Sequence, residues 1–207
     1  MAKASTGADP RGRGRPATVS PDAVAAVGLE MFMRDGFEAT TMTEIALAAG
    51  IARKTLFTYF PTKADIVWNR FQDQLADVRQ ALENTSNDVE TVDAIVAAVM
   101  RGLHMAPQEV PIVRAEVTLI RDTEVLQSYS YMQGAPWREA LARFIAEREG
   151  LEYDGVLPQV LAHGFWQAMF VAHRQWLDSD DPAPAAHIES ALVEFADAVR
   201  GAFPPRT

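Results

Sequence analysis

The chain has 207 residues, of which 48% are hydrophobic, no cysteine and a formal net charge of −9. This length allows a full hydrophobic core, as one large domain or a small domain joined to a larger one, and the lack of cysteine excludes disulfides, thiolate zinc sites and a cysteine nucleophile. No signal-peptide segment and no run of about 18 apolar residues is present, so we expect a cytoplasmic protein that does not span a membrane.

The charge is unevenly divided along the chain. Residues 1–63 contain 8 Lys and Arg against 6 Asp and Glu, a balance of +2, whereas residues 64–207 contain 11 against 22, a balance of −11. All three lysines lie in residues 1–63, and two of them, Lys54 and Lys63, lie in the stretch from Thr41 to Lys63. A mildly basic end on an acidic body fits a protein that touches DNA at that end only.

Residues 1–19 predict a disordered basic arm, because small and polar residues dominate and no apolar periodicity is present. Within it, Arg11, Arg13 and Arg15 alternate with glycine and precede Pro16. A thin, extended Gly-Arg-Pro segment suits the minor groove of A·T-rich DNA. The alternative is a solvated tail that contacts phosphates only.

Residues 20–63 predict a three-helix DNA-binding domain. Ser20 and Pro21 suit the start of a first helix, which Gly36 ends. This helix would brace the next two, and its core face consists of Val24, Val27, Met31 and Phe32.

The stretch from Thr41 to Lys63 predicts a helix-turn-helix. Thr41 and Glu44 form a capping box at the start of its first helix, and Gly50 suits the left-handed turn that ends it. The second helix begins near Arg53 and ends before Pro61, which disfavours helical geometry in the preceding residue.

The second motif helix is amphipathic in a way that suits DNA recognition. Leu56 and Phe60 point inward at i, i+4 spacing, which leaves cations, hydroxyls and a phenol facing outward. Lys63, at the first turn of the following helix, lies beside free backbone N–H groups and is predicted to hold a phosphate. The predicted DNA-contacting residues are Arg11, Arg13, Arg15, Thr41, Arg53, Lys54, Thr55, Thr58, Tyr59 and Lys63.

The pattern T-x-x-E-I-A-x-x-A-G-I-x-x-x-T-L-F-x-Y-F-x-x-K in this stretch resembles the signature of the tetracycline-repressor (TetR) family. The resemblance implies an all-helical dimer with an N-terminal DNA-binding domain and a C-terminal ligand pocket. One position departs from the family pattern, since Ala52 stands where serine is frequent. This change removes an N-cap worth about 1 kcal/mol from the recognition helix.

Residues 64–207 predict a ligand-binding and dimerisation domain, which gives about nine helices in all and no strand. A helix over residues 63–83 would link the two domains, because apolar residues recur along it at spacings of three and four. Residues 123–149 stay helical in pattern, but Gly134 and Pro136 must end or kink that helix.

The last two predicted helices suit a homodimer interface. Residues 156–177 are apolar on most sides, and residues 188–199 carry a second apolar stripe. Two such helices and their symmetry mates would form a four-helix bundle, and the family resemblance implies that dimer.

Aromatic, methionine and polar residues in this half could line a ligand cavity. The alternative for each of them is a plain core or dimer-interface position. The predicted ligand-binding residues are Arg114, Met132, Trp137, Phe144, His163, Trp166, Gln167 and Phe170, with Met169 as a further apolar lining residue.

The run W-R-E-A-L-A-R-F-I-A-E-R from Trp137 to Arg148 also resembles, more loosely, actinobacterial TetR-family regulators associated with mycofactocin. That resemblance implies an acyl-coenzyme A effector, or more generally an apolar ligand with an anionic end. Arg114, Arg121 or Arg143 could provide the counter-charge.

The chain contains no zinc-protease, phosphate-loop or nucleophile-elbow motif, and no cofactor or metal is predicted. The four histidines lack ligand-like spacing, and a lone histidine on an apolar helix is usually a hydrogen-bonded core or pocket group. They are His104, His163, His173 and His187.

The sequence as a whole predicts a dimeric transcriptional repressor, not an enzyme, that leaves a palindromic operator when a small molecule enters its pocket. An interaction protein with a degenerate helix-turn-helix is the first alternative. An all-helical enzyme is the second.

Overall fold

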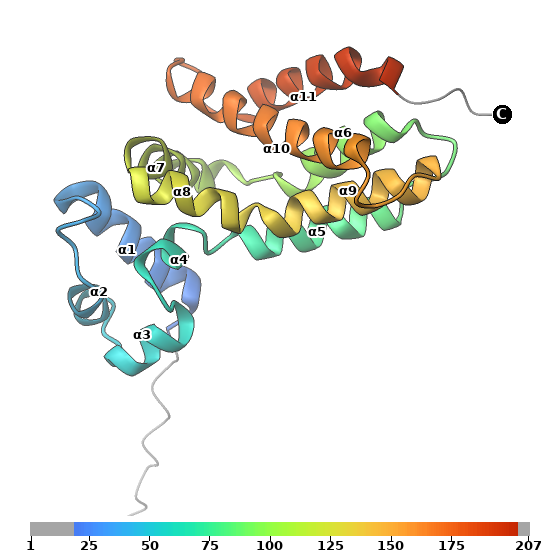
Figure 1. The fold of residues 1–207 in the computed structure, drawn as a ribbon. Helices are drawn as coiled ribbons and strands as arrows, with labels where there is room; N and C mark the ends of the chain where they lie inside the picture. Colours follow the sequence, from blue (N-terminus) through green and yellow to red (C-terminus); the bar gives the residue numbers. More distant parts are fainter. Residues whose placement is uncertain (1–18, 203–207) are drawn as a thin grey trace, which may run out of the picture.

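A computed structural model describes residues 19–202, in which all regular secondary structure is helical (Figure 1). This range contains eleven α-helices, two short 3-10 helices and no strand. Helices α1 to α4 form a small unit at one end, and the remaining helices pack into a larger body beside it (Figure 1). No helix in this range is long and apolar enough to cross a membrane.

The first three helices of the small unit lie where the sequence predicts a three-helix domain. They are α1 (Pro21–Asp35), α2 (Met42–Ala48) and α3 (Arg53–Tyr59). The Ser20 hydroxyl accepts the Ala23 N–H at 3.2 Å, and Thr41 and Glu44 form the expected capping box. Gly50 follows α2 with φ of 66°, a left-handed geometry in which a side chain would be strained. These signals, all within a few residues of the helix ends, confirm the predicted helix-turn-helix.

The predicted continuous helix over residues 63–83 is wrong. The structure divides it into α4 (Lys63–Val67) and α5 (Phe71–Glu83), with a turn at residues 68–70. Side chains of the turn bind other parts of the fold: Asn69 donates to Asp22 of α1 at 2.7 Å, and Arg70 forms an ion pair with Glu109 at 3.0 Å. Trp68 in the turn and Phe71 at the start of α5 are both buried, so the apolar spacing is kept although the helix is not.

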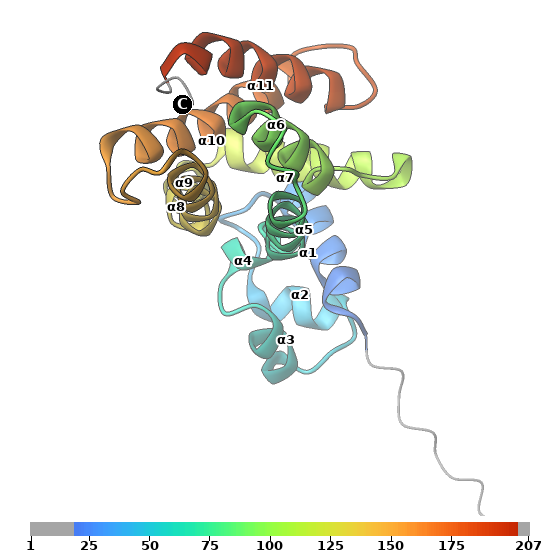
Figure 2. The same ribbon diagram turned by 90° about the vertical axis from the view of Figure 1, so that its right-hand side faces the viewer.

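The larger body consists of two layers of helices that cross near its middle (Figure 2). Helix α5 packs along α6, and α10 packs against both α9 and α11. The bounds of the remaining α-helices are α6 (Thr91–Gly102), α7 (Val110–Asp122), α8 (Glu124–Gln133), α9 (Ala135–Glu149), α10 (Val156–Leu177) and α11 (Ala185–Val199). The two 3-10 helices are η1 (Pro107–Glu109) and η2 (Arg200–Ala202).

An aromatic cluster fills the centre of this body and requires a glycine at position 134, where α8 ends as predicted. Phe71 stacks on Trp137 at a centroid distance of 5.3 Å and meets Trp166 edge-on at 5.4 Å. A Cβ atom at position 134 would lie only 2.4 Å from the Trp166 ring, so glycine allows α8 and α9 to approach α10. The breaks at residues 68–70 and at Gly134 account for eleven helices where about nine were expected.

Candidate DNA-binding surface and ligand cavity

Helix α3 presents a polar face to solvent, as the sequence predicts. Leu56 and Phe60 are buried, whereas Arg53, Lys54 and Thr58 are exposed and Thr55 is half-buried. The Thr58 hydroxyl donates to the Lys54 carbonyl at 3.0 Å within the helix. The exposed face thus combines two cations with hydroxyl groups, which suits contacts to phosphates and base edges.

One exposed aromatic residue of α3 was not among the predicted contacts. Phe57 is 39% exposed, and the Arg53 guanidinium lies 5.2 Å from the centre of its ring. The helical spacing already contained this signal, because a helix that buries Leu56 and Phe60 must turn Phe57 outward. An apolar ring beside a cation is suited to contact a thymine methyl group.

Tyr59, Lys63 and Thr41 also have structural contacts. Tyr59 is half-buried and its hydroxyl donates to the Val19 carbonyl at 3.2 Å, which ties α3 to the segment that leads into α1. The Lys63 ammonium donates to the carbonyls of Phe37 at 2.6 Å and Glu38 at 3.3 Å, and lies over the Phe37 ring. Thr41 is exposed, with its hydroxyl bonded to Glu44. A phosphate contact by Lys63 stays a prediction. To make it, the ammonium must either donate to the phosphate and the two carbonyls together or give up its bonds to the carbonyls.

The contacts of Lys63 predict a stability effect that is independent of DNA. Lys63→Met should lower the free energy of unfolding by about 2 kcal/mol, roughly 4–8 °C in melting temperature, because two carbonyls lose a charged donor. Lys54→Met is the matched control, since Lys54 is exposed on α3. Thermal unfolding of both variants measures the difference. Equal melting temperatures would show that the Lys63 contacts do not stabilise the unit.

The arginines of the predicted arm, Arg11, Arg13 and Arg15, lie outside the described residues. The contact between Tyr59 and Val19 places the start of the described chain beside α3.

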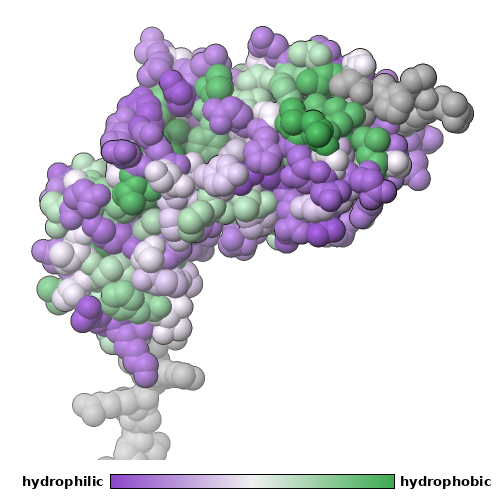
Figure 3. All heavy atoms as spheres, viewed as in Figure 1, coloured by the Kyte–Doolittle hydropathy of each residue, from purple (hydrophilic) through white to green (hydrophobic). Residues whose placement is uncertain are grey.

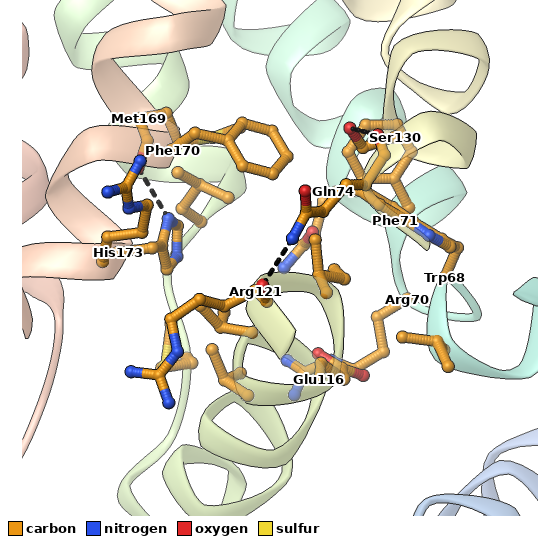
Figure 4. Close-up of a pocket in the computed structure, with 18 of the residues that line it drawn as sticks. Trp68, Arg70, Phe71, Gln74, Glu116, Arg121, Ser130, Met169, Phe170 and His173 are labelled. Atoms are coloured by element: carbon orange, nitrogen blue, oxygen red, sulfur yellow. Dashed lines mark hydrogen bonds between the residues drawn. The ribbon is translucent and has the colours of Figure 1, made fainter. Parts of the chain in front are cut away.

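A cavity of about 610 Å³ lies between α4–α5, α7, α8 and α10 (Figure 4). Its inner lining is largely apolar. Trp68, Phe71 and Met169 are buried there, and Phe170 is half-buried. Its exposed lining residues are polar: Gln127, Gln167, Arg174 and Asp178. This volume lies within the roughly 300–1,000 Å³ typical of small-molecule sites, and the distribution suits a ligand with an apolar part and a polar end.

A carboxyl group lines the cavity at the end nearest the DNA-binding unit. Glu116 of α7 is half-buried, and Figure 4 shows it on the same side of the cavity as Arg70. Burial among protein atoms raises the pKa of Glu116 to about 8, against the opposing effect of the Arg70 charge. The side chain is therefore largely protonated at neutral pH and can donate a hydrogen bond to a ligand.

A neutral histidine lines the cavity opposite this carboxyl. His173 is buried, and its Nδ1 lies 2.8 Å from the Met169 carbonyl, to which it donates (Figure 4). Burial lowers the pKa of His173 below its ordinary value. Because Nδ1 carries the proton, Nε2 is left as an acceptor. His173 is thus a hydrogen-bonded pocket residue, one of the two environments that the sequence analysis expects for a lone histidine on an apolar helix.

Two of the eight residues predicted to bind ligand, Gln167 and Phe170, line this cavity, as does Met169. Trp137 and Trp166 are buried in the aromatic cluster behind Phe71 and Phe170. The other predicted residues lie elsewhere: Arg114 stacks on Trp176, Met132 is 63% exposed, Phe144 lines a separate surface groove, and His163 is exposed with its Nδ1 bonded to the Gln159 carbonyl.

Of the three arginines considered as counter-charges, Arg121 lines the cavity. Arg143 pairs with Glu139 on the surface, and Arg114 donates to the Asp181 carbonyl. A second arginine, Arg174, lies at the exposed rim of the cavity and was not among the predicted counter-charges. No group of three or more His, Asp or Glu side chains that could hold a metal ion occurs among the described residues.

Comparison with known families decides the classification. Residues 25–67 match the bacterial regulatory proteins of the tetR family, and residues 89–200 match the MftR C-terminal domain. The chain belongs to the TetR family. This membership confirms the predicted DNA-binding transcriptional regulator, and it argues against the enzyme alternative.

Full-length relatives support the same assignment. MftR of Mycobacterium tuberculosis, named as a transcriptional regulator of mycofactocin biosynthesis, is 34% identical over 164 residues, 79% of this chain and 83% of that protein. TcmR of Streptomyces glaucescens, named as a helix-turn-helix transcriptional regulator, is 27% identical over 201 residues, 91% of this chain and 89% of TcmR. The first relative confirms the looser resemblance to mycofactocin-associated regulators.

Solved structures show that the fold is shared. Thermus thermophilus FadR, a TetR-family repressor in complex with lauroyl-CoA, has a TM-score of 0.59 at 17% identity, covering 91% of this chain and 97% of FadR. The complex of SmeT with triclosan has a TM-score of 0.59 at 18% identity, covering 90% of this chain and 95% of SmeT. At these identities the likeness extends to the fold alone.

Proposed function

We propose that this TetR-family protein is a homodimeric repressor that binds an inverted-repeat operator and releases it when an apolar or acyl-coenzyme A-like ligand enters the cavity. One observation carries the proposal: α4 follows the exposed recognition helix directly, and its last residue, Val67, lies in the cavity wall. Ligand and DNA thus act on two ends of one five-residue helix. Such a regulator acts on chromosomal DNA, so we propose that it works in the cytoplasm.

Helix α3 would read the major groove, with Arg53, Thr55 and Phe57 at base edges and Lys54 and Thr58 at or near phosphates. This division follows from side-chain chemistry, because hydroxyl, guanidinium and apolar groups discriminate bases whereas an ammonium acts as a point charge. The arm residues Arg11, Arg13 and Arg15, together with Thr41, Tyr59 and Lys63, would add backbone or minor-groove contacts.

The lining of the cavity supports the ligand class. An apolar chain would lie against Trp68, Phe71 and Phe170, where water is excluded on binding. Anionic groups would lie at the exposed rim, near Arg121 and Arg174. Arg121 already pairs with Asp122 and Asp178, so an entering anion would compete with these carboxylates.

The dimer would form through α10 and α11. Exposed apolar residues gather over the first turns of α10 in Figure 3, where Val156 is 81% and Val160 59% exposed. Val171 of α10 and Val193 of α11 are also exposed apolar residues of these two helices. A large exposed apolar patch of this kind marks an interaction surface, and a closed twofold contact is the commonest arrangement.

A gel-shift titration with the DNA upstream of the protein's own gene tests the proposal. We expect a specific complex on an inverted repeat, which lauroyl-CoA dissociates and acetyl-CoA, with too short a chain to fill the cavity, does not. Val117→Trp, which fills the cavity from α7, should keep operator binding and reduce the response to lauroyl-CoA about tenfold or more.

Two outcomes would contradict the proposal in different ways. Absence of any specific complex would favour an interaction protein with a degenerate helix-turn-helix. A specific complex that neither acyl-CoA dissociates would leave the operator role intact and reject the proposed ligand class.

A further inference from the structure

A single carboxylate, that of Asp65, joins the start of α4 to a helix of the larger body. Its Oδ2 accepts the Thr62 backbone N–H at 2.7 Å and the Thr62 hydroxyl at 2.8 Å, which completes the capping box of α4. Its Oδ1 accepts the hydroxyl of Tyr129 from α8 at 2.7 Å. One side chain therefore fixes the beginning of α4 and also attaches it to α8.

On the DNA-binding side, this carboxylate acts directly behind the recognition helix. Helix α3 ends at Tyr59, and α4 begins at Lys63, whose ammonium holds the α1–α2 connection through Phe37 and Glu38. Loosening the Thr62–Asp65 cap would free the segment that sets the position of α3 relative to α1. Side-chain caps of this type contribute measurably to whether a short helix forms.

On the other side, α8 belongs to the cavity wall. Gln127 and Ser130 line the cavity, and Tyr129 lies between them in sequence but points to α4. The Gln127 amide donates to the Arg121 carbonyl at 2.5 Å, which holds the start of α8 to the end of α7. At its other end Gly134 lies against Trp166 of α10, so displacement of α7 or α10 by a ligand would carry α8 with it.

The Tyr129 contact is sensitive to small movements. Burial, followed by the bond to Asp65, raises the pKa of Tyr129, which favours the protonated hydroxyl that donates this bond. A hydroxyl–carboxylate bond keeps its strength only between about 2.5 and 3.0 Å, so a shift of α8 by roughly 1 Å would break it.

We propose that the Tyr129–Asp65 hydrogen bond is a coupling contact that transmits occupancy of the cavity to the recognition helix through the cap of α4. Tyr129 is in this sense a positioning residue, because it lines neither the cavity nor the DNA-facing side of α3. The inference rests on the proposed function and names the contact through which that function is regulated.

Tyr129→Phe removes the hydroxyl and keeps the ring, and Tyr131→Phe is the matched control on α8, since Tyr131 is 66% exposed. Without ligand, we expect amide hydrogen exchange over residues 62–67 to rise about tenfold in Tyr129→Phe, the effect of losing one bond to a charged acceptor, and to stay unchanged in the control. A merely structural role in α8 would raise exchange in α8 itself and leave α4 protected.

A double-mutant cycle on operator affinity is the second readout. Tyr129→Phe should change operator affinity several-fold and reduce the response to lauroyl-CoA by about fivefold or more, and it should have no further effect in an Asp65→Ala background, which has no side-chain acceptor for the hydroxyl. Unchanged exchange at α4, or additive effects of the two substitutions, would overturn the coupling contact. If lauroyl-CoA fails to release the wild-type protein, the proposed ligand class is wrong, whereas the exchange and the cycle still decide the role of Tyr129.

Discussion

Val160→Asp should convert the protein from a dimer to a monomer and weaken operator binding on the order of 100-fold or more, because a monomer loses the gain from engaging two half-sites at once. Val160 is exposed in the single chain and lies one turn from Val156 on the same face of α10. A carboxylate there would face its own symmetry mate or an apolar surface, and burying an unpaired charge costs several kcal/mol.

Sedimentation and gel-shift titration of this variant measure both effects on one sample. Val125→Asp is the matched control, because Val125 is 50% exposed on α8, away from α10 and α11. We expect the control to remain dimeric and to bind the operator as the wild type does. A Val160→Asp protein that stays dimeric would place the interface on another surface, and a monomer with undiminished operator affinity would reject the paired half-site arrangement.

The sequence was most informative where the determinants of structure are local. The capping box of Thr41 and Glu44 and the turn at Gly50 each depend on a few neighbouring residues, so their geometry could be predicted without knowledge of tertiary contacts. Pro61, which ends α3, was recognisable in the sequence in the same way.

The break at residues 68–70 could not be found in this way. Its causes are contacts to distant segments, Asn69 with Asp22 and Arg70 with Glu109, and such contacts leave no trace in the spacing of apolar residues. The consequence for function is large. The predicted single helix would have joined the two domains directly, whereas the structure joins them through a turn held by these contacts.

The cavity could be anticipated in composition but not in detail. Trp137, Trp166 and Phe170 are equivalent as sequence features, yet the first two pack in the aromatic cluster and only Phe170 lines the open space. Which aromatic faces a cavity depends on how α5, α9 and α10 cross. Glu116 escaped prediction for a different reason, because on an amphipathic helix a carboxylate is expected to face solvent.

Glu116→Gln should stabilise the protein at pH 8 and remove a pH dependence that the wild type shows. The folded protein holds the proton of Glu116 up to a pKa of about 8, whereas the unfolded chain releases it near the ordinary value of 4.5. Between these pH values the folded state binds more protons than the unfolded state, so the free energy of unfolding must fall as pH rises, and level off above pH 8.

Between these pH values, the free energy of unfolding of the wild type should fall by about 1–2 kcal/mol. The full shift at 1.36 kcal/mol per pKa unit would give more, but the carboxyl faces a cavity that water can enter, so the effect is discounted accordingly. His173 acts in the opposite direction, because its lowered pKa removes stability as pH falls below about 6.5. Comparison of the variant with the wild type cancels this contribution, since both proteins retain His173.

Urea unfolding at pH 5, 6.5 and 8 measures the effect, with Glu83→Gln, an exposed position on α5, as the matched control. The difference in free energy of unfolding between Glu116→Gln and the wild type should grow in favour of the variant from pH 5 to pH 8. Only the wild type has an ionisable group at this position, and its unfolded state is favoured as pH rises because the unfolded chain releases the proton more easily. The control should follow the wild type at all three values. A constant difference between Glu116→Gln and the wild type across this range would mean that Glu116 is already ionised in the folded protein, and that the cavity presents a negative charge, not a hydrogen-bond donor, to its ligand.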